Sequence, residues 1–447
     1  MNELVNFLFN KTPLYFLVQS IWRDEAFSYL LAKRSLIDIL VLSARDYNPP
    51  LYYLILHFWI KIFGFSEVSL RSLSFIFYWA TVYIFYLFLI NLLKIKSRIF
   101  NFLYLLLIIT NPLLIYYAFE ARMYTMFAFL ATLSFYSLLI SNRKLHLIST
   151  TLGLFTHYFM IVVVLTQLIY LYTVKNFLKE RYRSINNFLT SYLLSFACFL
   201  PWLVLVIIQK TNLLFQPFWI KRLSLGESLS FLLAVYTGYT KDLNFKDKNL
   251  FLFLQLIIVF LIFFLLLKIL SAKKEKKKLF FSFGIWAVVL PLLIILISFI
   301  VRPIFLPRYL IFSTVGLLLL LVLSLEIMPK NLRILVLLIL LVFNFNYNLS
   351  QVKYRKKFNI RKIVREIKLL AKKDDLLYVT DVLNFHEAQY YFGEKRVFIY
   401  KKSYEEIPHY VGKVLIPKEK IAYYLPTYPI KAFILFPNGH YEVQALF

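Results

Sequence analysis

The sequence predicts a polytopic α-helical membrane protein with a small α/β domain at its C-terminal end. Of the 447 residues, 61% are hydrophobic and only 17% are charged, whereas a soluble domain is nearer half apolar. The charges cluster between long uncharged runs, most of which have the roughly 20 residues that a helix needs to cross a hydrocarbon core. The last part of the chain lacks such runs and has the pattern of short strands and helices.

Uncharged runs mark the candidate spans: 72–93, 99–119, 123–142, 145–174, 184–209, 249–267, 279–301, 309–325 and 334–352. Residues 1–20 add a weaker first span, which Asn6, Asn10 and Lys11 interrupt. The run 145–174 has basic residues at both ends, and as one helix it would measure roughly 45 Å. We therefore expect a hairpin of two short helices, with its tip near Gly153 and Thr156-His157 at membrane depth. The total is about eleven spans.

Short basic loops predict the orientation, because Lys and Arg are enriched in cytoplasmic loops. Five loops hold 17 basic residues: Lys94/Lys96/Arg98, Arg143/Lys144, Lys175/Lys179/Arg181/Arg183, Lys268 with Lys273–Lys278, and Lys330/Arg333. With these inside, the segments 21–71, 118–123, 208–248, 302–308 and 353–447 fall outside. We thus expect a transmembrane domain over 1–352, with outer loops 21–71 and 208–248, and an extracytoplasmic α/β domain over 353–447. The protein would reside in the cell (inner) membrane.

Two further regions have recognisable patterns. Residues 26–45 and 51–63 mix aromatic and polar groups and predict amphipathic helices along the outer interface. In the C-terminal domain we expect a basic helix over 358–372 and a second helix near 383–392. Four short strands are expected there, at Leu376–Thr380, Val397–Tyr400, Val414–Ile416 and Ala432–Phe436.

The net charge of +28 also fits nucleic-acid binding. The basic residues sit in short loops between apolar spans. We therefore expect membrane lipids as partners and no nucleic acid. The single cysteine, Cys198, excludes an intramolecular disulfide and a cysteine-based metal cluster.

Isolated polar residues reach the same predicted outer face from separate loops. They are Asp24, Glu25, Asn48, Glu120, Arg122, His157 and Arg308. Ionisable groups next to lipid are costly, so their recurrence on one side of the membrane predicts a functional site.

The paired acids Asp24 and Glu25 are the candidate catalytic residues. A carboxylate beside a second carboxylate, and partly desolvated, has a raised pKa that suits proton abstraction, so Asp24 is the candidate general base. The alternative is structural, because acids are also favoured at helix N-termini and a helix is expected from about Ala26.

Arginines on the same face are candidate phosphate ligands, since guanidinium offers paired donors to phosphate oxygens. These are Arg122, in the segment from Glu120 to Tyr124, and Arg308, which follows two prolines. Alternatively, both side chains snorkel from helix ends, or Arg122 pairs with Glu120. His157 could touch substrate, ligate a metal or bond a neighbouring helix, and we favour the last. A divalent metal bound near Asp24, Glu25 and Glu120 is conceivable, but no ligand spacing argues for one.

Six motifs together resemble one family. They are Trp-x-Asp-Glu-Ala at 22–26, Asn-Pro-Pro-Leu-Tyr-Tyr at 48–53, Phe-Gly-Phe-Ser-Glu at 63–67 with Leu70-Arg71, Glu-Ala-Arg-Met-Tyr at 120–124, Thr-His-Tyr-Phe at 156–159 and Pro-Arg-Tyr-Leu at 307–310. In order and spacing they resemble bacterial membrane glycosyltransferases related to dolichyl-phosphate-mannose–protein mannosyltransferase and the lipid A aminoarabinose transferase. The resemblance covers most of residues 20–325. The family's first span is usually longer and cleaner than residues 1–20.

This resemblance implies the C-type glycosyltransferase fold and a polyprenyl-phosphate sugar as donor. By the same resemblance, Asp24 matches the acid proposed as base and Glu25 its neighbour. Glu120 and Arg122 match the acidic–basic motif, and Arg308 is a lipid-phosphate ligand. The implied activity is transfer of a sugar to a hydroxyl on an acceptor lipid, glycan or protein, with inversion at the anomeric carbon.

A transporter or flippase of lipid-linked sugars is the alternative from another class. Transporters tend to show related halves and charges near the bilayer midplane. The sequence shows no related halves, and its charges lie toward one predicted face. A ligase that moves a whole glycan from a lipid diphosphate is disfavoured by the motif set.

Overall fold

The computed structural model describes residues 2–178, 182–209, 220–239, 248–269 and 271–447. Its contacts divide the chain into two compact units. Unit 1 comprises residues 1–16, 72–203 and 220–355, and unit 2 comprises 17–71, 204–219 and 356–447. Parts of the predicted loops 175–183 and 208–248 lie outside the described residues.

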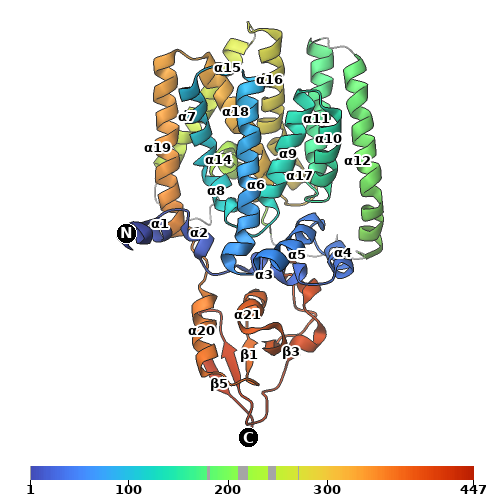
Figure 1. Cartoon of the computed structure of the whole chain (residues 1–447), viewed down its shortest axis with the longest axis vertical. Coiled ribbons are helices and arrows are strands. Elements are labelled where there is room, and N and C mark those ends of the chain that lie inside the picture. The colour runs from blue at the N-terminus through green and yellow to red at the C-terminus, as the bar shows by residue number, and fades with distance from the viewer. Residues whose placement is uncertain (1, 179–181, 210–219, 240–247, 270) are drawn as a thin grey trace. The chain divides into compact units, whose positions relative to one another are not determined.

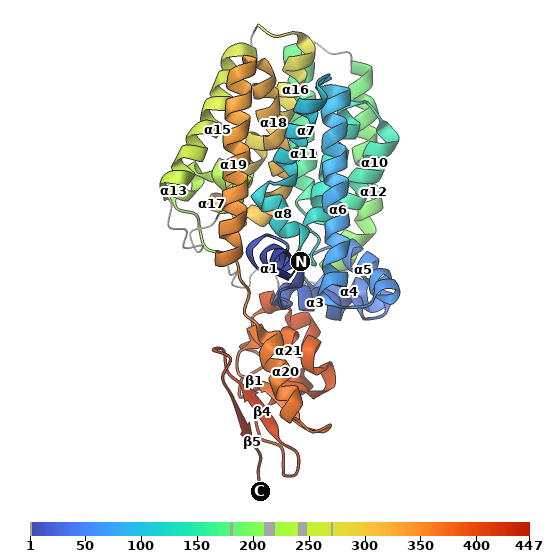
Figure 2. The same cartoon turned by 60° about the vertical axis from the view of Figure 1, so that its left-hand side comes forward.

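Unit 1 is built from long helices that run roughly parallel to one another in both views (Figures 1 and 2). Its main helices are α6 (Glu67–Leu87, with its first turn in unit 2), α7 (Arg98–Ile109), α8 (Pro112–Ala118), α9 (Tyr124–Leu139), α10 (Arg143–Leu154), α11 (Met160–Leu178), α12 (Tyr182–Gln209), α15 (Lys248–Ile269), α16 (Lys274–Gly284), α17 (Leu290–Ile300), α18 (Ile311–Ile327) and α19 (Lys330–Tyr354). Two short helices, α13 (Leu225–Leu229) and α14 (Phe231–Thr237), lie in the described part of the predicted loop 208–248.

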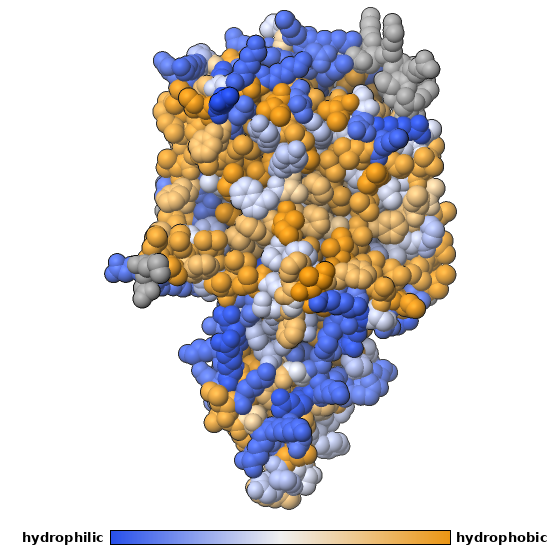
Figure 3. Space-filling model, viewed as in Figure 1, coloured by the Kyte–Doolittle hydropathy of each residue, from blue (hydrophilic) through white to orange (hydrophobic). Residues whose placement is uncertain are grey.

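Apolar side chains cover the flank of this bundle. Among the described residues, six helices are long and apolar enough to cross a membrane, or seven if the bent pair α7–α8 is one span. The space-filling view shows a broad hydrophobic band over these helices and hydrophilic residues at the end that carries the α15–α16 connection (Figure 3). The predicted polytopic helical architecture is therefore confirmed, while the count of about eleven spans stays a prediction.

The predicted hairpin in the run 145–174 is present. Helix α10 ends at Leu154, α11 begins at Met160, and the turn between them contains Thr156 and His157. A Cβ on Gly153 would come within 2.7 Å of the Met160 Sδ, so the close approach at this turn favours glycine.

The predicted first span is wrong as a single helix. Residues 1–20 form α1 (Asn2–Lys11) and α2 (Tyr15–Val18), with Pro13 between them. Neither helix has the roughly 20 residues that a transmembrane helix needs. Proline lacks the backbone N–H that a continuous helix would use, which explains the interruption.

The N-terminal part of unit 2 contains three short helices, α3 (Arg23–Ala32), α4 (Leu36–Arg45) and α5 (Leu51–Phe63). The sequence predicted one amphipathic segment over 26–45, but Ser35 ends that continuity by capping α4 through the Asp38 N–H. Helix α3 is not amphipathic, because Glu25 through Ala32 are all buried. Helices α4 and α5 do expose apolar side chains, among them Ile37 and Ile62.

The C-terminal part of unit 2 is a five-stranded sheet in the order β3-β2-β1-β4-β5, with helices α20 (Ile360–Leu370) and α21 (Phe385–Phe392). Its strands are β1 (Leu376–Val379), β2 (Val397–Tyr400), β3 (Ile421–Ala422), β4 (Ala432–Leu435) and β5 (Tyr441–Gln444). All neighbouring pairs are parallel except β4 with β5. Both helices and three strands were predicted. The strand expected at Val414–Ile416 is wrong, since this segment forms 3-10 turns.

Candidate functional site

The motif from Glu120 to Tyr124 occupies a sharp turn between α8 and α9 in unit 1. Helix α8, which leads into this turn, is capped at its N-terminus by Asn111. The Asn111 side-chain oxygen accepts from the N–H groups of Leu113 and Leu114 at 3.2 and 3.1 Å. Helix α7 therefore breaks at Asn111, and the pair α7–α8 bends by 61°. The Ser74 hydroxyl of α6 donates to the Arg122 carbonyl at 3.1 Å and ties the turn to a neighbouring helix.

Two aromatic rings lie beside Arg308. The Arg308 guanidinium lies 5.8 Å from the ring centre of Tyr124 and 5.4 Å from that of Tyr309. Arg308 belongs to a 3-10 turn at Pro307–Leu310 that follows an irregular stretch and leads into α18.

His157, at the tip of the α10–α11 hairpin, joins the same cluster. Its ring stacks on Phe127, with the ring centres 4.9 Å apart, and lies 5.4 Å from the Tyr309 ring. The Phe159 N–H donates to His157 Nδ1 at 3.1 Å, so the neutral ring carries its proton on Nε2. The sequence favoured a bond to a neighbouring helix, whereas this hydrogen bond joins His157 to a residue of its own turn.

Charged side chains lie near His157. Arg122 and Arg308 both interact electrostatically with the His157 ring, and Glu120 and Arg308 both interact electrostatically with Tyr117. Glu120, Arg122 and His157 are buried. The structure thus brings together five residues from three segments far apart in the sequence: Glu120, Arg122 and Tyr124 of one motif, His157, and Arg308. We call these five the arginine cluster.

Arg355 is a neighbour of this cluster that sequence reasoning missed. Its guanidinium lies 4.3 Å from the ring centre of Tyr116, and both Arg355 and Arg308 act on Tyr117. Its Nη2 donates to the Gly238 carbonyl at 2.7 Å. The one sequence signal for Arg355 was its position just beyond the last apolar run. An arginine at such a position is usually interpreted as an ordinary interfacial residue, so the signal did not single it out.

The paired acids belong to unit 2 and have different surroundings. The Glu25 carboxylate is fully buried and faces the fully buried Arg71 guanidinium. Arg71 donates from Nε to Glu25 Oε1 and from Nη2 to Oε2, both at 2.8 Å, in bidentate geometry. Lys357 Nζ and the Trp22 N–H also donate to Oε2, at 3.2 and 2.9 Å. Glu25 therefore receives four N–H donors and caps α3, the structural alternative that the sequence left open.

Asp24 is the more accessible of the two acids. Its side chain is 15% exposed, and its Oδ1 accepts from Arg23 Nε at 3.2 Å. The Ser28 hydroxyl donates to the Asp24 carbonyl at 2.9 Å and holds the first turn of α3. Both acids are thus ion-paired, Glu25 in a fully buried pair with Arg71 and Asp24 in a partly exposed pair with Arg23.

The segment before Asp24 is fixed by residues far away in the sequence. Arg71 Nη1 donates to the carbonyls of Leu17 and Gln19 at 2.9 and 2.8 Å. From the C-terminal part, Arg361 Nη2 donates to the Val18 carbonyl at 3.0 Å. The Ile21 N–H donates to the Tyr391 hydroxyl at 2.7 Å. We call residues 17–25 the acid loop.

Asn48 lies half-buried in the connection between α4 and α5, beside the rigid Pro49-Pro50 corner. It belongs to unit 2, and its predicted role in substrate binding stays a prediction. Within the part of the chain that the structure describes, no group of three or more His, Cys, Asp and Glu side chains has the arrangement of a metal site.

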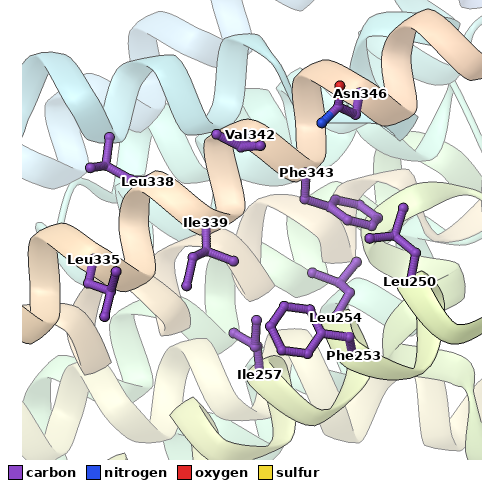
Figure 4. A pocket seen from close by; sticks show the side chains of 10 residues that line it. All are labelled: Leu250, Phe253, Leu254, Ile257, Leu335, Leu338, Ile339, Val342, Phe343 and Asn346. Atoms are coloured by element: carbon purple, nitrogen blue, oxygen red, sulfur yellow. The ribbon is translucent and has the colours of Figure 1, made fainter.

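An apolar groove of about 300 Å³ lies between α15 and α19 of unit 1 (Figure 4). Nine of its ten lining residues are apolar, and Asn346 is the exception. Without ionisable groups in its lining, this groove offers an apolar surface and no acid–base chemistry.

Comparison with known proteins gives matches in structure alone. No family model and no curated protein matches the chain. ArnT from Cupriavidus metallidurans in the apo state matches with a TM-score of 0.65 at 10% identity, over 98% of this chain and 92% of that one. The same enzyme bound to undecaprenyl phosphate matches with a TM-score of 0.65 at 12% identity, over 98% and 93%. An apo oligosaccharyltransferase from Archaeoglobus fulgidus matches with a TM-score of 0.54 at 12% identity, over 96% and 67%.

These neighbours confirm the fold that the motifs predicted. ArnT, a lipid A aminoarabinose transferase, and the archaeal enzyme are both C-type glycosyltransferases. The chain has their fold, and its apolar helices identify it as a multi-pass membrane protein.

Proposed function

We propose that the chain is an integral-membrane glycosyltransferase that moves a sugar from a polyprenyl-phosphate donor to an acceptor hydroxyl on the outer face of the cell membrane. The arginine cluster carries this proposal. It combines two guanidinium groups with aromatic rings in a membrane protein of this fold. Guanidinium binds phosphate oxygens through paired donors. A matched structure, ArnT bound to undecaprenyl phosphate, supports a lipid phosphate as the ligand class.

We assign the base to Asp24 and a positioning role to Glu25. Both acids were predicted as catalytic, but the Glu25 carboxylate already receives four N–H donors. Such donors stabilise the ionised form and make it a weak base. Asp24 is partly exposed and sits one residue away, on the loop that Glu25 anchors.

The proposed reaction is a single displacement. The acceptor hydroxyl gives its proton to Asp24, and its oxygen attacks the anomeric carbon as the bond to the lipid-phosphate oxygen breaks. The transition state resembles an oxocarbenium ion, as in glycosidases, and one displacement inverts the anomeric centre. The departing phosphate gains negative charge, which Arg122 and Arg308 stabilise.

The topology expected from the sequence completes the proposal. The short basic loops, taken as cytoplasmic, would place Asp24, the arginine cluster and the C-terminal domain on the extracytoplasmic side. Asn48 and Tyr124 are assigned to substrate binding, and the acceptor is a lipid, a glycan or a protein.

The direct test is transfer of a labelled sugar. Membranes that contain the chain are incubated with a polyprenyl-phosphate sugar labelled in the sugar, and the label is followed into lipid, glycan and protein fractions. We expect label on a new acceptor, and none with the Asp24→Asn variant. Movement of intact lipid-linked sugar across the membrane without transfer would instead support the flippase alternative.

A further inference from the structure

A second charged site, a basic pocket, lies on unit 2. It has a volume of about 440 Å³ and is lined by Lys33, Arg34, Gly393, Glu394, Lys395 and Arg396. Its basic residues come from two separate segments: the link between α3 and α4, and the turn after α21. We call it the basic pocket.

Several contacts set the positions of its cations. Glu394 accepts from Lys33 Nζ at 2.7 Å and from Arg34 Nη2 at 3.0 Å. Arg396 donates to the carbonyls of Lys372 and Lys373 at 3.3 and 3.1 Å. An ammonium has three donors and a guanidinium five, so the ion pairs with Glu394 use only part of the capacity of Lys33 and Arg34.

The charge balance favours an anion. Lys420 adds a fifth basic side chain by donating to the carbonyls of Glu394 and Lys395 at 2.7 and 2.9 Å. The pocket lining therefore holds four basic side chains and one carboxylate, that of Glu394, and Lys420 is hydrogen-bonded to the same turn. The volume falls in the range of ordinary ligand pockets.

Exposed apolar side chains follow Lys33 and Arg34 directly in the sequence. Helix α4 starts two residues after Arg34, and its Leu36, Ile37 and Leu40 are 43%, 74% and 36% exposed. The adjoining α5 exposes Ile62 and Phe63 only four residues before α6 enters the first candidate membrane span. Exposed apolar helix faces next to basic side chains are typical of segments that bind at a membrane interface.

We propose that the basic pocket binds the phosphate-bearing headgroup of an anionic phospholipid, while the apolar face of α4 inserts among the acyl chains of the same leaflet. The proposal concerns how unit 2 docks on a lipid surface. It does not depend on the transferase activity and holds or fails without it.

Native mass spectrometry of the detergent-purified full chain tests the proposal. Phosphatidylglycerol and phosphatidylcholine are titrated separately, and bound lipid molecules are counted. We expect phosphatidylglycerol to bind more tightly. The double variant Lys33→Gln/Arg34→Gln should weaken its first binding event by about 10- to 30-fold. Lys395→Gln, from the other segment, should weaken it by a smaller factor.

The matched control removes two positive charges elsewhere on unit 2, as Lys362→Gln/Lys402→Gln, and should leave the binding unchanged. Equal binding of both lipids, or an equal loss in the control, would overturn the proposal. Soluble glycerol phosphate is added as a competitor. If it displaces the lipid at similar concentrations, the pocket is a site for soluble anions and the lipid proposal is wrong.

Discussion

The two charged regions of this molecule use their ions in opposite ways. In unit 2, Glu25 and Arg71 are both fully buried and form a bidentate ion pair. In unit 1, Arg308 lies over the rings of Tyr124 and Tyr309, and its charge and that of Arg122 act on His157. The Glu25–Arg71 pair matches one buried charge with its opposite. The arginine cluster holds two arginines and one acid, Glu120, with Arg308 beside two aromatic rings.

Under the proposed function, this difference separates a structural role from a role in substrate binding. A buried, fully hydrogen-bonded ion pair fixes the segments that carry it, and breaking it is costly. Positive charges gathered beside rings attract an anion and offer faces for a sugar. Substitutions in the two regions should therefore differ in kind, with loss of stability in one and loss of turnover in the other.

The largest effect is expected from Asp24→Asn. Removal of a general base lowers the rate by about 10²- to 10⁴-fold, so sugar transfer should fall to near background while yield and thermal stability stay unchanged. Transfer of the labelled sugar and thermal unfolding in detergent measure the two quantities. Asp38→Asn, on the exposed part of the same unit, is the matched control. Full activity of the Asp24 variant would remove this residue as the base.

Glu25→Gln should act on stability. It leaves Arg71 buried without its counter-charge, which costs about 3–5 kcal/mol. We expect a lower unfolding temperature and a lower yield of folded protein, whereas Glu366→Gln, from an exposed pair with Lys362, should change neither. A stable but inactive Glu25 variant would show that this carboxylate, and not Asp24 alone, takes part in the chemistry.

Arg308→Gln should lower turnover with little change in stability. Loss of one donor to a developing anion lowers kcat by about 10²- to 10³-fold. Arg302→Gln, earlier in the same loop, is the control and should retain activity. Equal losses in both variants would mean that the loop as a whole matters and that Arg308 has no special role as a phosphate ligand.

The smallest effect concerns pH. Burial raises the pKa of Glu387 on α21 to about 8, although the backbone and charge of Arg23 and the charge of Lys357 lower it and Glu25 raises it further. Because the folded state holds this proton more tightly, its contribution to stability is complete below about pH 4.5 and is lost as pH rises toward 8. The loss is up to about 1.4 kcal/mol per pH unit. Unfolding temperatures at pH 6 and pH 8 should differ less in Glu387→Gln than in the parent.

Much of the architecture followed from local patterns. Uncharged runs located the long helices, and basic residues at both ends of 145–174 required the hairpin whose tip carries His157. Alternation and β-branched residues located strands such as Val397–Tyr400. The errors have local causes as well. Pro13 interrupts the first segment, and Val414–Ile416 lies between Gly412, with φ of 84°, and Pro417, which leaves room only for turns.

The ion-pair partners within each charged region could not be predicted from the sequence. Arg71 and Glu25 are 46 residues apart, and Lys357 and Glu25 are 332 apart, so no spacing rule connects them. Sequence placed Asp24 and Glu25 in one role because they are adjacent. The difference comes from the tertiary structure. Arg71 of α6 and Lys357 of the C-terminal part reach Glu25 and supply three of its four donors, whereas Asp24 stays partly exposed.

The burial of the Arg71–Glu25 pair has a consequence for ionic strength. Counterions screen exposed charges over a Debye length of about 8 Å in physiological salt, but buried pairs are screened much less. The Lys33 side chain is 55% exposed in its contact with Glu394, whereas Arg71 and Glu25 are at 0%. Added salt should therefore weaken surface ion pairs of unit 2 such as Lys33–Glu394 and leave the buried Arg71–Glu25 pair, next to Asp24, nearly unchanged.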